Sequence, residues 1–506
     1  MRKTCRLHLR LDGLTLTLTA VVALSAANRA AAEVPTAPAG NPNTATPGTT
    51  KGAEPSPAQS NSTRTLLSSR GCGSATAGTG NKIITYQGKT HVAWLDSNEN
   101  GYFAVIRTLD RKTGTWSQTH TIGKSQDNHG RPAMTIDRQG YLHVVYGLHH
   151  NAIPYRRSLR PNDASAWTEP VVFGNKLSYP TLMCGADGAL YLTGRYEWAG
   201  VRLYVKPPGQ AWEDRGLIMR SEQRCRGYAA FHSGLAWGPQ QRVLHFACRT
   251  FQSSKRQPSE LWGDIQSVNY MRSGDFGRTW ERANGTPIAL PATMETADLL
   301  MGGEGFDPKP GIRNDGTLVV DSQGRPYVLY YRNTPEKPGQ SYLARHAGDR
   351  WQQLPLQAAM EKHHPGWAIV DSRAGLSITT DDVLCLTLIV APIDHPKAAW
   401  NGKPLSKYFH EPAYWTNYIP QSKRIVWLES RDGGQTFITR RIVNPDPQRG
   451  EVQPSLERPT GFNRIPAGSY PGLLYVSTKT FTKWNEEKLV DNDVVWLQVE
   501  ARQRKP

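Results

Sequence analysis

Four histidines lie close together in one short stretch of the chain, residues 127–158 (DNHGRPAMTIDRQGYLHVVYGLHHNAIPYRRS). They are His129, His143, His149 and His150. Histidine titrates near neutral pH, so an imidazole can act as a general acid, a general base or a metal ligand. A hairpin with a purely structural role has little use for so many imidazoles. This stretch is therefore the first candidate for a site of chemistry.

Three arginines end strand-like runs that share one pattern. Arg195 ends LYLTGR, Arg249 ends LHFACR and Arg332 ends PYVLYYR, while the equivalent run LHVVYGLH ends at His149. Equivalent positions in successive repeats are expected around one mouth of a ring-shaped fold. The arginine fork matches a carboxylate or a sulfate. Their common register favours a shared anion site over the alternative of unrelated strand-end arginines on the surface.

Other candidates are placed by their distance from these strands. His129 lies in a turn, and Tyr179, in SYP, precedes Arg195 by one hairpin, so all three can reach the same rim. Tyr228, in RGYAAFH, is placed likewise in the next repeat, although a tyrosine there is often a packing residue. His364, before Pro365, either lines the cavity from a later repeat or occupies a loop.

Not every histidine of the stretch is expected to be functional. His143 lies mid-strand between apolar residues, which is typical of a core histidine with satisfied hydrogen bonds. His150 follows His149 directly, so strand alternation sends its side chain to the other face or into the loop. Because the two are adjacent, either could be the functional histidine, and His150 is kept as a substrate-binding candidate.

These residue types suit elimination across a 4-linked uronic acid. Arginine would neutralise the carboxylate so that the C5 proton becomes acidic, and neutral histidine or tyrosine would act as the base and the acid. The residues alone do not decide which is which. No convincing carboxylate pair accompanies the histidines, which argues against ordinary glycoside hydrolysis.

The elements that must position these residues are strands. Beyond residue 80, short β-branched and aromatic runs alternate with Gly, Asp, Asn and Pro turns, which predicts an all-β protein. A pattern of one turn, two strands and an aromatic residue recurs at spacings of roughly 45–65 residues, which is typical of propeller blades. We count about seven and predict a seven-bladed β-propeller. Ser273–Trp280 (SGDFGRTW) and Ser430–Phe437 (SRDGGQTF) match the Asp-box of BNR-like repeats, a structural hairpin turn.

The chain ends and composition define the domains. Residues 1–32 are expected to be a signal peptide, with a basic start and the apolar run Leu14–Ala26, so a secreted or periplasmic protein is expected. Residues 33–75 are rich in Pro, Ala, Thr, Ser and Gly and predict a disordered linker. Residues 76–506 would form the catalytic propeller. No later segment is apolar enough for a membrane span.

The 506 residues carry a formal net charge of +17, which favours a polyanionic partner. No zinc-finger, helix-turn-helix or Lys/Arg-rich run supports nucleic acid, so an anionic polysaccharide is expected, although a solvated surface bias would give the same excess. We expect a monomer that needs no cofactor for catalysis.

The quoted motifs resemble BNR-repeat polysaccharide lyases, the ulvan lyases of polysaccharide-lyase families 24 and 25, over most of the chain after about residue 80. The resemblance implies a seven-bladed propeller and β-elimination at uronic acid. By motif, His129 and His149 match the two catalytic histidines, Tyr179 the catalytic tyrosine and Arg195 the carboxylate neutraliser. Tyr228 matches a further active-site tyrosine. Ulvan itself as the substrate does not follow from the resemblance.

The resemblance also implies a structural metal, zinc or calcium. Cys225, His232 and Cys248 flank a hairpin and could supply part of a zinc site. Their spacing is not that of a standard finger, and three unrelated buried side chains is the alternative reading.

Two other functions remain open at this point. A sialidase-like hydrolase also uses an Asp-box propeller, but its RIP motif should open the first blade, and Arg464–Pro466 lies near the C-terminus. A non-catalytic carbohydrate-binding propeller would keep the arginines but would not need His129 together with Tyr179.

Overall fold

The computed structural model describes residues 62–72, 74–222, 229–252, 265–303, 312–314, 316–332, 340–392, 399–400, 403–404, 423–442, 446–478 and 492–499. In these ranges the only helices are α1 (Gln357–His363) and the 3-10 turn η1 (Pro239–Gln241), and all other regular structure is strand. Neither helix has the length and hydrophobicity needed to cross a membrane. The predicted all-β class is confirmed. The predicted signal peptide, residues 1–32, lies outside the described residues.

Two large sheets hold the first fourteen strands, β1 to β14, and the C-terminal strands β32 to β34. The first runs β32 (Gly450–Leu456), β33 (Leu473–Thr478), β34 (Asn492–Val499), β1 (Ser62–Gly71), β3 (Lys89–Asn98), β4 (Gly101–Asp110) and β5 (Thr115–Trp116), with β2 (Ile83–Tyr86) on β3 and β6 (His120–Ser125) on β4. The second runs β14 (Glu213–Arg220), β13 (Gly200–Lys206), β12 (Leu190–Tyr196), β11 (Val171–Cys184), β9 (His149–Arg160), β8 (Leu142–Val145) and β7 (Ala133–Ile136), with β10 (Asp163–Trp167) on β9.

The remaining sheets follow in chain order. The third contains β15 (Ala230–Trp237), β16 (Leu244–Gln252), β17 (Ile265–Ser273), β18 (Trp280–Glu281), β19 (Pro287–Ile288) and β20 (Asp298–Gly302). The fourth contains β21 (Ile312–Arg313), β22 (Leu318–Val320), β23 (Pro326–Arg332), β24 (Gln340–Ala347) and β25 (Arg350–Pro355). The fifth contains β26 (Trp367–Ile378), β27 (Leu384–Pro392), β30 (Arg424–Ser430) and β31 (Ile438–Arg441), and β28 (Ala399–Trp400) pairs with β29 (Lys403–Pro404).

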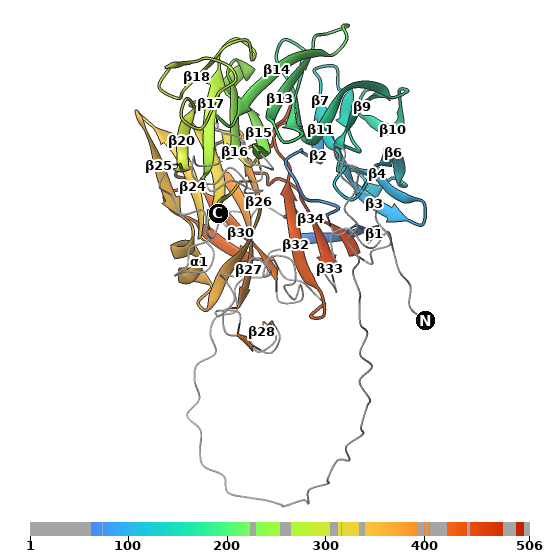
Figure 1. Cartoon of the computed structure of the whole chain (residues 1–506). Helices are drawn as coiled ribbons and strands as arrows, with labels where there is room; N and C mark the ends of the chain where they lie inside the picture. The colour runs from blue at the N-terminus through green and yellow to red at the C-terminus, as the bar shows by residue number, and fades with distance from the viewer. Residues whose placement is uncertain are drawn as a thin grey trace, which may run out of the picture. The chain divides into compact units, whose positions relative to one another are not determined.

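The first strand of each antiparallel unit packs on the first strand of the next. Contacts run from β2 to β7, β11, β15, β22, β26 and β32 in that order, so the sheets follow one another side by side, as the colour sequence of Figure 1 also shows. Apolar clusters fill the spaces between neighbouring sheets; one of them joins Met183, Tyr191, Phe246 and Trp280. The arrangement is propeller-like.

Strand β1 joins the two ends of the described chain. It pairs antiparallel with β34 from Ser62↔Val499 to Gly71↔Asn492, and Gly71 also pairs with Asp96 of β3 (Figure 1). The predicted disordered linker, residues 33–75, is therefore wrong for Ser62–Gly71. Composition alone misled the prediction, because the backbone hydrogen bonds of β1 come from a strand more than 400 residues away. The rest of that range before residue 62 lies outside the described residues.

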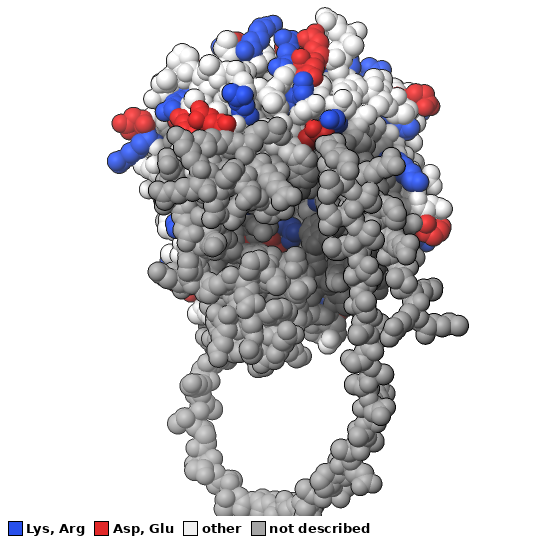
Figure 2. Space-filling view, in the orientation of Figure 1, with Lys and Arg blue, Asp and Glu red and all other residues white. Residues whose placement is uncertain are grey.

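Charge on the described surface is mixed. In Figure 2 the described Lys and Arg side chains stand among Asp and Glu and do not merge into one basic patch on the face in view. The formal charge of +17 is thus not concentrated on this part of the described surface.

Candidate active site

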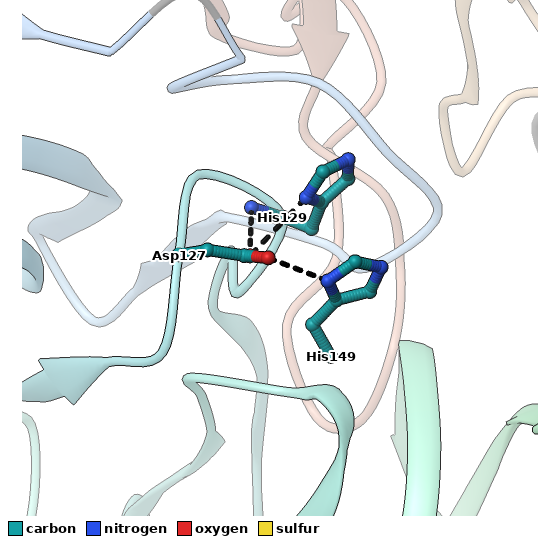
Figure 3. A group of neighbouring side chains, drawn as sticks. All are labelled: Asp127, His129 and His149. Carbon is teal, nitrogen blue, oxygen red and sulfur yellow. Dashed lines mark hydrogen bonds and ion pairs between the residues drawn. The ribbon is translucent and has the colours of Figure 1, made fainter. Parts of the chain in front are cut away.

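Two imidazoles of the histidine-rich stretch, those of His129 and His149, meet at one carboxylate, Asp127 (Figure 3). His129 Nδ1 lies 3.2 Å from Asp127 Oδ1, and His149 Nδ1 lies 2.5 Å from Asp127 Oδ2. The two imidazoles stack with ring centroids 4.1 Å apart and an interplanar angle of 20°. All three side chains are half-buried. The structure thus brings together the two histidines chosen from the sequence and adds a carboxylate between them.

Close backbone packing brings the His129 turn to the start of β9. Gly147 N–H donates to Gly130 O at 2.9 Å, and a Cβ on Gly130 would lie 2.7 Å from the Gly147 backbone. Glycine at position 130 is therefore required for this approach. At the strand end, Asn151 Oδ1 accepts a 2.6 Å hydrogen bond from His149 N–H. These backbone contacts set the distance between His129 and His149.

Tyr179 and Arg195 reach the same place from the next two strands. Ser178 of β11 pairs with His149 of β9 on one side and with Arg195 of β12 on the other. A bulge follows Ser178, and Tyr179 has a positive φ of 54°. Residues other than glycine rarely adopt this backbone conformation. It turns the Tyr179 side chain away from the direction that regular strand alternation would give it. The predicted one-hairpin relationship between Tyr179 and Arg195 is confirmed.

The tyrosine lies between the histidines and the arginine. Its ring centroid is 6.3 Å from that of His129 and 6.2 Å from that of His149. Arg195 Cζ lies 4.6 Å from the Tyr179 ring centroid, within cation–π range. Arg195 is only 1% exposed, so its guanidinium is buried beside the tyrosine.

His150 is also part of the site, contrary to the expectation that it faces away from His149 or lies in the loop. Its Nε2 accepts a 2.8 Å hydrogen bond from Arg195 Nη2, and its ring lies 4.8 Å from that of His149. The physical reason is a φ of 61° at His150, which breaks the alternation of successive side chains. Ser178 Oγ accepts the His150 N–H at 2.9 Å and holds this conformation.

The electrostatics of the site keep His129 and His150 neutral. Burial lowers the pKa of His129, and the hydrogen bond to Asp127 only partly offsets it. Burial, together with the positive charge of Arg195, lowers the pKa of His150 to about 4. Burial would raise the pKa of the Asp127 carboxyl, but the hydrogen bonds from His129 and His149 outweigh it, so this pKa lies well below its usual range. At neutral pH the site therefore holds an anionic carboxylate and unprotonated His129 and His150.

Three further residues were missed in the sequence. Arg131 Cζ lies 5.4 Å from the Tyr179 ring centroid, and Trp198, 39% exposed, lies 5.1 Å from the His150 ring and 5.8 Å from Arg195 Cζ. Asp127 is the third. Its position two residues before His129 in a turn was the available signal, since an Asp there can bend back onto the following side chain.

For three other predicted members of the anion site, the described contacts are with residues near them in the fold. Arg249 Cζ lies 4.3 Å from the Phe251 ring centroid, and Arg249 donates to Gln266 Oε1 at 3.4 Å, both in its own sheet. Arg332 ends β23 opposite Gln340. His364 ends α1, where its N–H donates to Met360 O. The participation of these three residues stays a prediction.

The predicted metal set is only partly described. Cys225 and Tyr228 lie outside the described residues. Cys248 is fully buried in an apolar cluster, and burial raises the pKa of its thiol far above the usual range. His232 packs edge-on against Tyr179 with centroids 4.7 Å apart. The structural metal site stays a prediction, because Cys225, one of its three predicted ligands, lies outside the described residues.

His143 behaves as predicted. It is 6% exposed, its Nδ1 lies 2.7 Å from Tyr155 Oη, and its Nε2 lies 3.1 Å from Asp137 Oδ2. Both ring nitrogens have hydrogen-bond partners in the core, so a structural role accounts for this histidine.

Known proteins resemble this chain in sequence. Residues 89–359 match the model of the family described as BNR repeat-containing family member. An "Ulvan Lyase-PL25" of Pseudoalteromonas sp. (strain PLSV) is 29% identical over 409 residues, which cover 71% of this chain and 73% of that protein. An "Ulvan lyase" of Alteromonas sp. (strain LOR) is 23% identical over 48% of this chain and 56% of its own length, so the match spans little more than half of that relative.

A solved structure supports the fold. A polysaccharide lyase described as "PL25-Ulvanlyase" superposes with a TM-score of 0.59 at 18% identity, covering 84% of this chain and 95% of that one. The same lyase has been solved bound to -[GlcA(1-4)Rha3S]-, with the same TM-score of 0.59. At 18% identity, this similarity supports the fold alone.

Proposed function

The chain belongs to the BNR repeat-containing family, and from that premise we propose that it is a polysaccharide lyase that cleaves an ulvan-like, uronate-containing polysaccharide by β-elimination. The observation that carries the proposal is the meeting of His129, His149 and Tyr179 beside the buried guanidinium of Arg195. The names of the relatives agree with it, since they include ulvan lyases that match 71% and 48% of this chain.

In this mechanism Arg195 binds the uronate carboxylate, which lowers the cost of building negative charge at C5. A neutral base among His129, His149 and Tyr179 removes the C5 proton. The electron pair of the C5–H bond forms the C4=C5 double bond, the C4–O4 bond breaks, and the leaving O4 takes a proton from an acid in the same group. No water enters the products, so a paired-carboxylate site is unnecessary.

The rim supports an anionic, sugar-shaped ligand. Trp198 exposes 39% of its surface beside Arg195 and His150 and can stack on a pyranose ring. Arg131, whose Cζ lies 5.4 Å from the Tyr179 ring centroid, adds positive charge for a sulfate or a second uronate. The ligand bound to the solved relative, a glucuronate linked to a sulfated rhamnose, has this chemistry.

For the fold, we propose seven four-stranded blades, with β1 completing the last one. The inner strands would be β2, β7, β11, β15, β22, β26 and β32. The turns of Ser273–Trp280 and Ser430–Phe437 would be Asp-boxes, since Asp275 and Asp432 each accept hydrogen bonds from the backbone and hydroxyl of the threonine four residues on. We also propose that residues 1–32 direct export and that the protein acts outside the cytoplasm as a monomer.

One assay separates the lyase from the alternatives. The purified protein is incubated with ulvan and other uronate polysaccharides, and ultraviolet absorbance from the unsaturated uronate is followed. Rising absorbance supports the lyase; new reducing ends without absorbance would indicate a hydrolase, and binding alone a carbohydrate-binding protein. His129→Ala and Arg195→Ala should lose about 10²-fold or more in kcat/KM, whereas the control His120→Ala, on β6 away from the site, should retain activity. Substantial activity of either site variant would contradict the assignment.

A further inference from the structure

Asp127 contacts both candidate histidines through different oxygens. Oδ1 faces His129 Nδ1 at 3.2 Å, and Oδ2 faces His149 Nδ1 at 2.5 Å. Resting on the proposed function, we propose that Asp127 is a positioning residue that holds both imidazoles as Nδ1–H tautomers and so presents both Nε2 atoms, unprotonated, to the substrate. Neither the sequence motifs nor the names of the relatives assign a role to this carboxylate.

The simpler alternative is that Asp127 only shapes its turn. It does cap the turn, since Oδ1 accepts the His129 N–H at 2.8 Å. That role uses one oxygen and would be filled equally by asparagine. The 2.5 Å hydrogen bond from Oδ2 to His149, 22 residues further along the chain, has no function in the turn. Because each oxygen of Asp127 contacts a different imidazole, the carboxylate does more than cap its turn. We call this arrangement of Asp127, His129 and His149 the clamp.

The clamp sets the direction of both rings. An ionised carboxylate accepts hydrogen bonds and donates none, so each facing Nδ1 must carry a proton while the ring is neutral. Figure 3 shows the second nitrogen of each ring directed away from the carboxylate. The stacking of the rings at 4.1 Å keeps these two nitrogens on the same side. Both lone pairs are thus aimed together, and Tyr179 lies 6.2–6.3 Å from either ring.

The clamp also limits the charge of the pair. When one Nε2 takes the C5 proton, the resulting imidazolium keeps its Nδ1–H on the anionic Asp127, which stabilises it. Two imidazolium rings stacked at this distance would repel each other, so one carboxylate supports one positive charge. The pair can therefore hold one substrate proton and pass it to the leaving oxygen or to solvent.

A metal ion is the competing occupant. One ligand atom from each of Asp127, His129 and His149 lies within 4.8 Å of the others. However, a metal must lie close to the plane of each imidazole that ligates it, and two rings stacked 20° from parallel do not converge on one point. The 2.5 Å between Asp127 Oδ2 and His149 Nδ1 is shorter than an ordinary N–H···O hydrogen bond, so the two atoms are in direct contact.

The test is Asp127→Asn. The amide oxygen of asparagine can accept one Nδ1–H, but its NH₂ group donates, so one ring must move its proton to Nε2. Asp127→Glu keeps the charge and is the rescue variant. Asp137→Asn is the matched control, because Asp137 makes the same kind of contact with the core histidine His143 at 3.1 Å. The full-length chain is used throughout.

Two readouts are compared. Nitrogen NMR of labelled histidines should show His129 and His149 as Nδ1–H tautomers in the unmodified protein and an Nε2–H form of one of them in Asp127→Asn. On ulvan, Asp127→Asn should lose about 100-fold or more in kcat with KM within a few-fold, and Asp127→Glu should recover part of the loss and of the acid limb of the pH profile. Asp137→Asn should retain kcat.

Three results would contradict the proposed role of Asp127. One is an Nε2–H tautomer for both rings in the unmodified protein. A second is full kcat in Asp127→Asn, and a third is stoichiometric Zn²⁺ binding that Asp127→Asn abolishes. The tautomers are measured without substrate, so this part of the test does not depend on the proposed function. If no uronate polysaccharide is cleaved but both rings are Nδ1–H tautomers, the proposed function is refuted and the role of Asp127 is not.

Discussion

Arg195 donates a hydrogen bond from Nη2 to Nε2 of His150 at 2.8 Å. The acceptor nitrogen cannot carry a proton, so His150 is neutral while this contact lasts. Its pKa of about 4, set by burial and by Arg195, agrees with the geometry. The residue proposed to bind the carboxylate is thus oriented by a neutral imidazole, which leaves its positive charge available to the substrate.

Replacing Arg195 by lysine should be severe although the charge is kept. Lysine offers a point charge without the planar fork that can hold His150 and a carboxylate together. We expect kcat/KM on ulvan to fall about 100-fold or more. Arg202→Lys is the control, since Arg202 forms a partly exposed ion pair with Asp214 at 2.7 Å. Equal losses in the two variants would mean that Arg195 has no special role.

Trp198 should affect binding more than turnover. It is 39% exposed, and its described contacts are with His150 and Arg195, neither of which is proposed to transfer a proton. Trp198→Ala should raise KM about tenfold, equivalent to about 1.4 kcal/mol of lost stacking, with kcat changed only a few-fold. Trp198→Phe should recover most of the affinity. A large fall in kcat with unchanged KM would instead assign Trp198 to the positioning of His150 and Arg195.

Stability should fall on mild acidification because of buried neutral histidines. Burial lowers the pKa of His91 to about 4 and that of His245 to about 3, whereas in the unfolded chain both titrate near 6.5. Between about pH 6.5 and 4 the unfolded state therefore binds more protons, so the free energy of unfolding decreases as pH falls. Above pH 6.5 these two histidines contribute no slope.

His245→Gln isolates this effect from other titrating groups. Glutamine can still hydrogen-bond Tyr270, whose Oη lies 2.6 Å from His245 Nδ1. Denaturant unfolding at several pH values should show a flatter acid slope than the unmodified protein, with a difference of order 3 kcal/mol accumulated by pH 4. Parallel slopes would show that His245 is not neutral in the folded state. Buried Glu451, with its pKa raised to about 8, acts in the opposite direction and is common to both proteins.

Strand β1 should be essential although it lies near the N-terminus. A chain starting at Ser62 keeps the pairing with β34, and one starting at Cys72 loses it. Removal would expose an unpaired edge on β34 and would take Leu67, which is 5% exposed, away from the apolar cluster that contains Trp94 and Trp496. We expect the first chain to unfold like the full-length protein and the second to lose several kcal/mol or aggregate. Equal thermal midpoints would show that β1 does not close the fold.

The sequence by itself determined the class of the fold and most of the chemistry. Strand alternation and turn residues are local signals, so the all-β class, the core place of His143 and the candidacy of His129, His149, Tyr179 and Arg195 could be read without coordinates. Each of these inferences needs only a periodicity, a motif or the order of residues along one hairpin.

Only the tertiary structure decided which of these residues meet. The left-handed backbone at His150 and Tyr179 breaks the alternation that predicted where their side chains point. The hydrogen bond from His149 to Asp127 and the pairing of β1 with β34 join segments that are distant in sequence. Such contacts depend on bulges, close glycine packing and the closure of one sheet on another, and a linear pattern of residue types does not encode these distances.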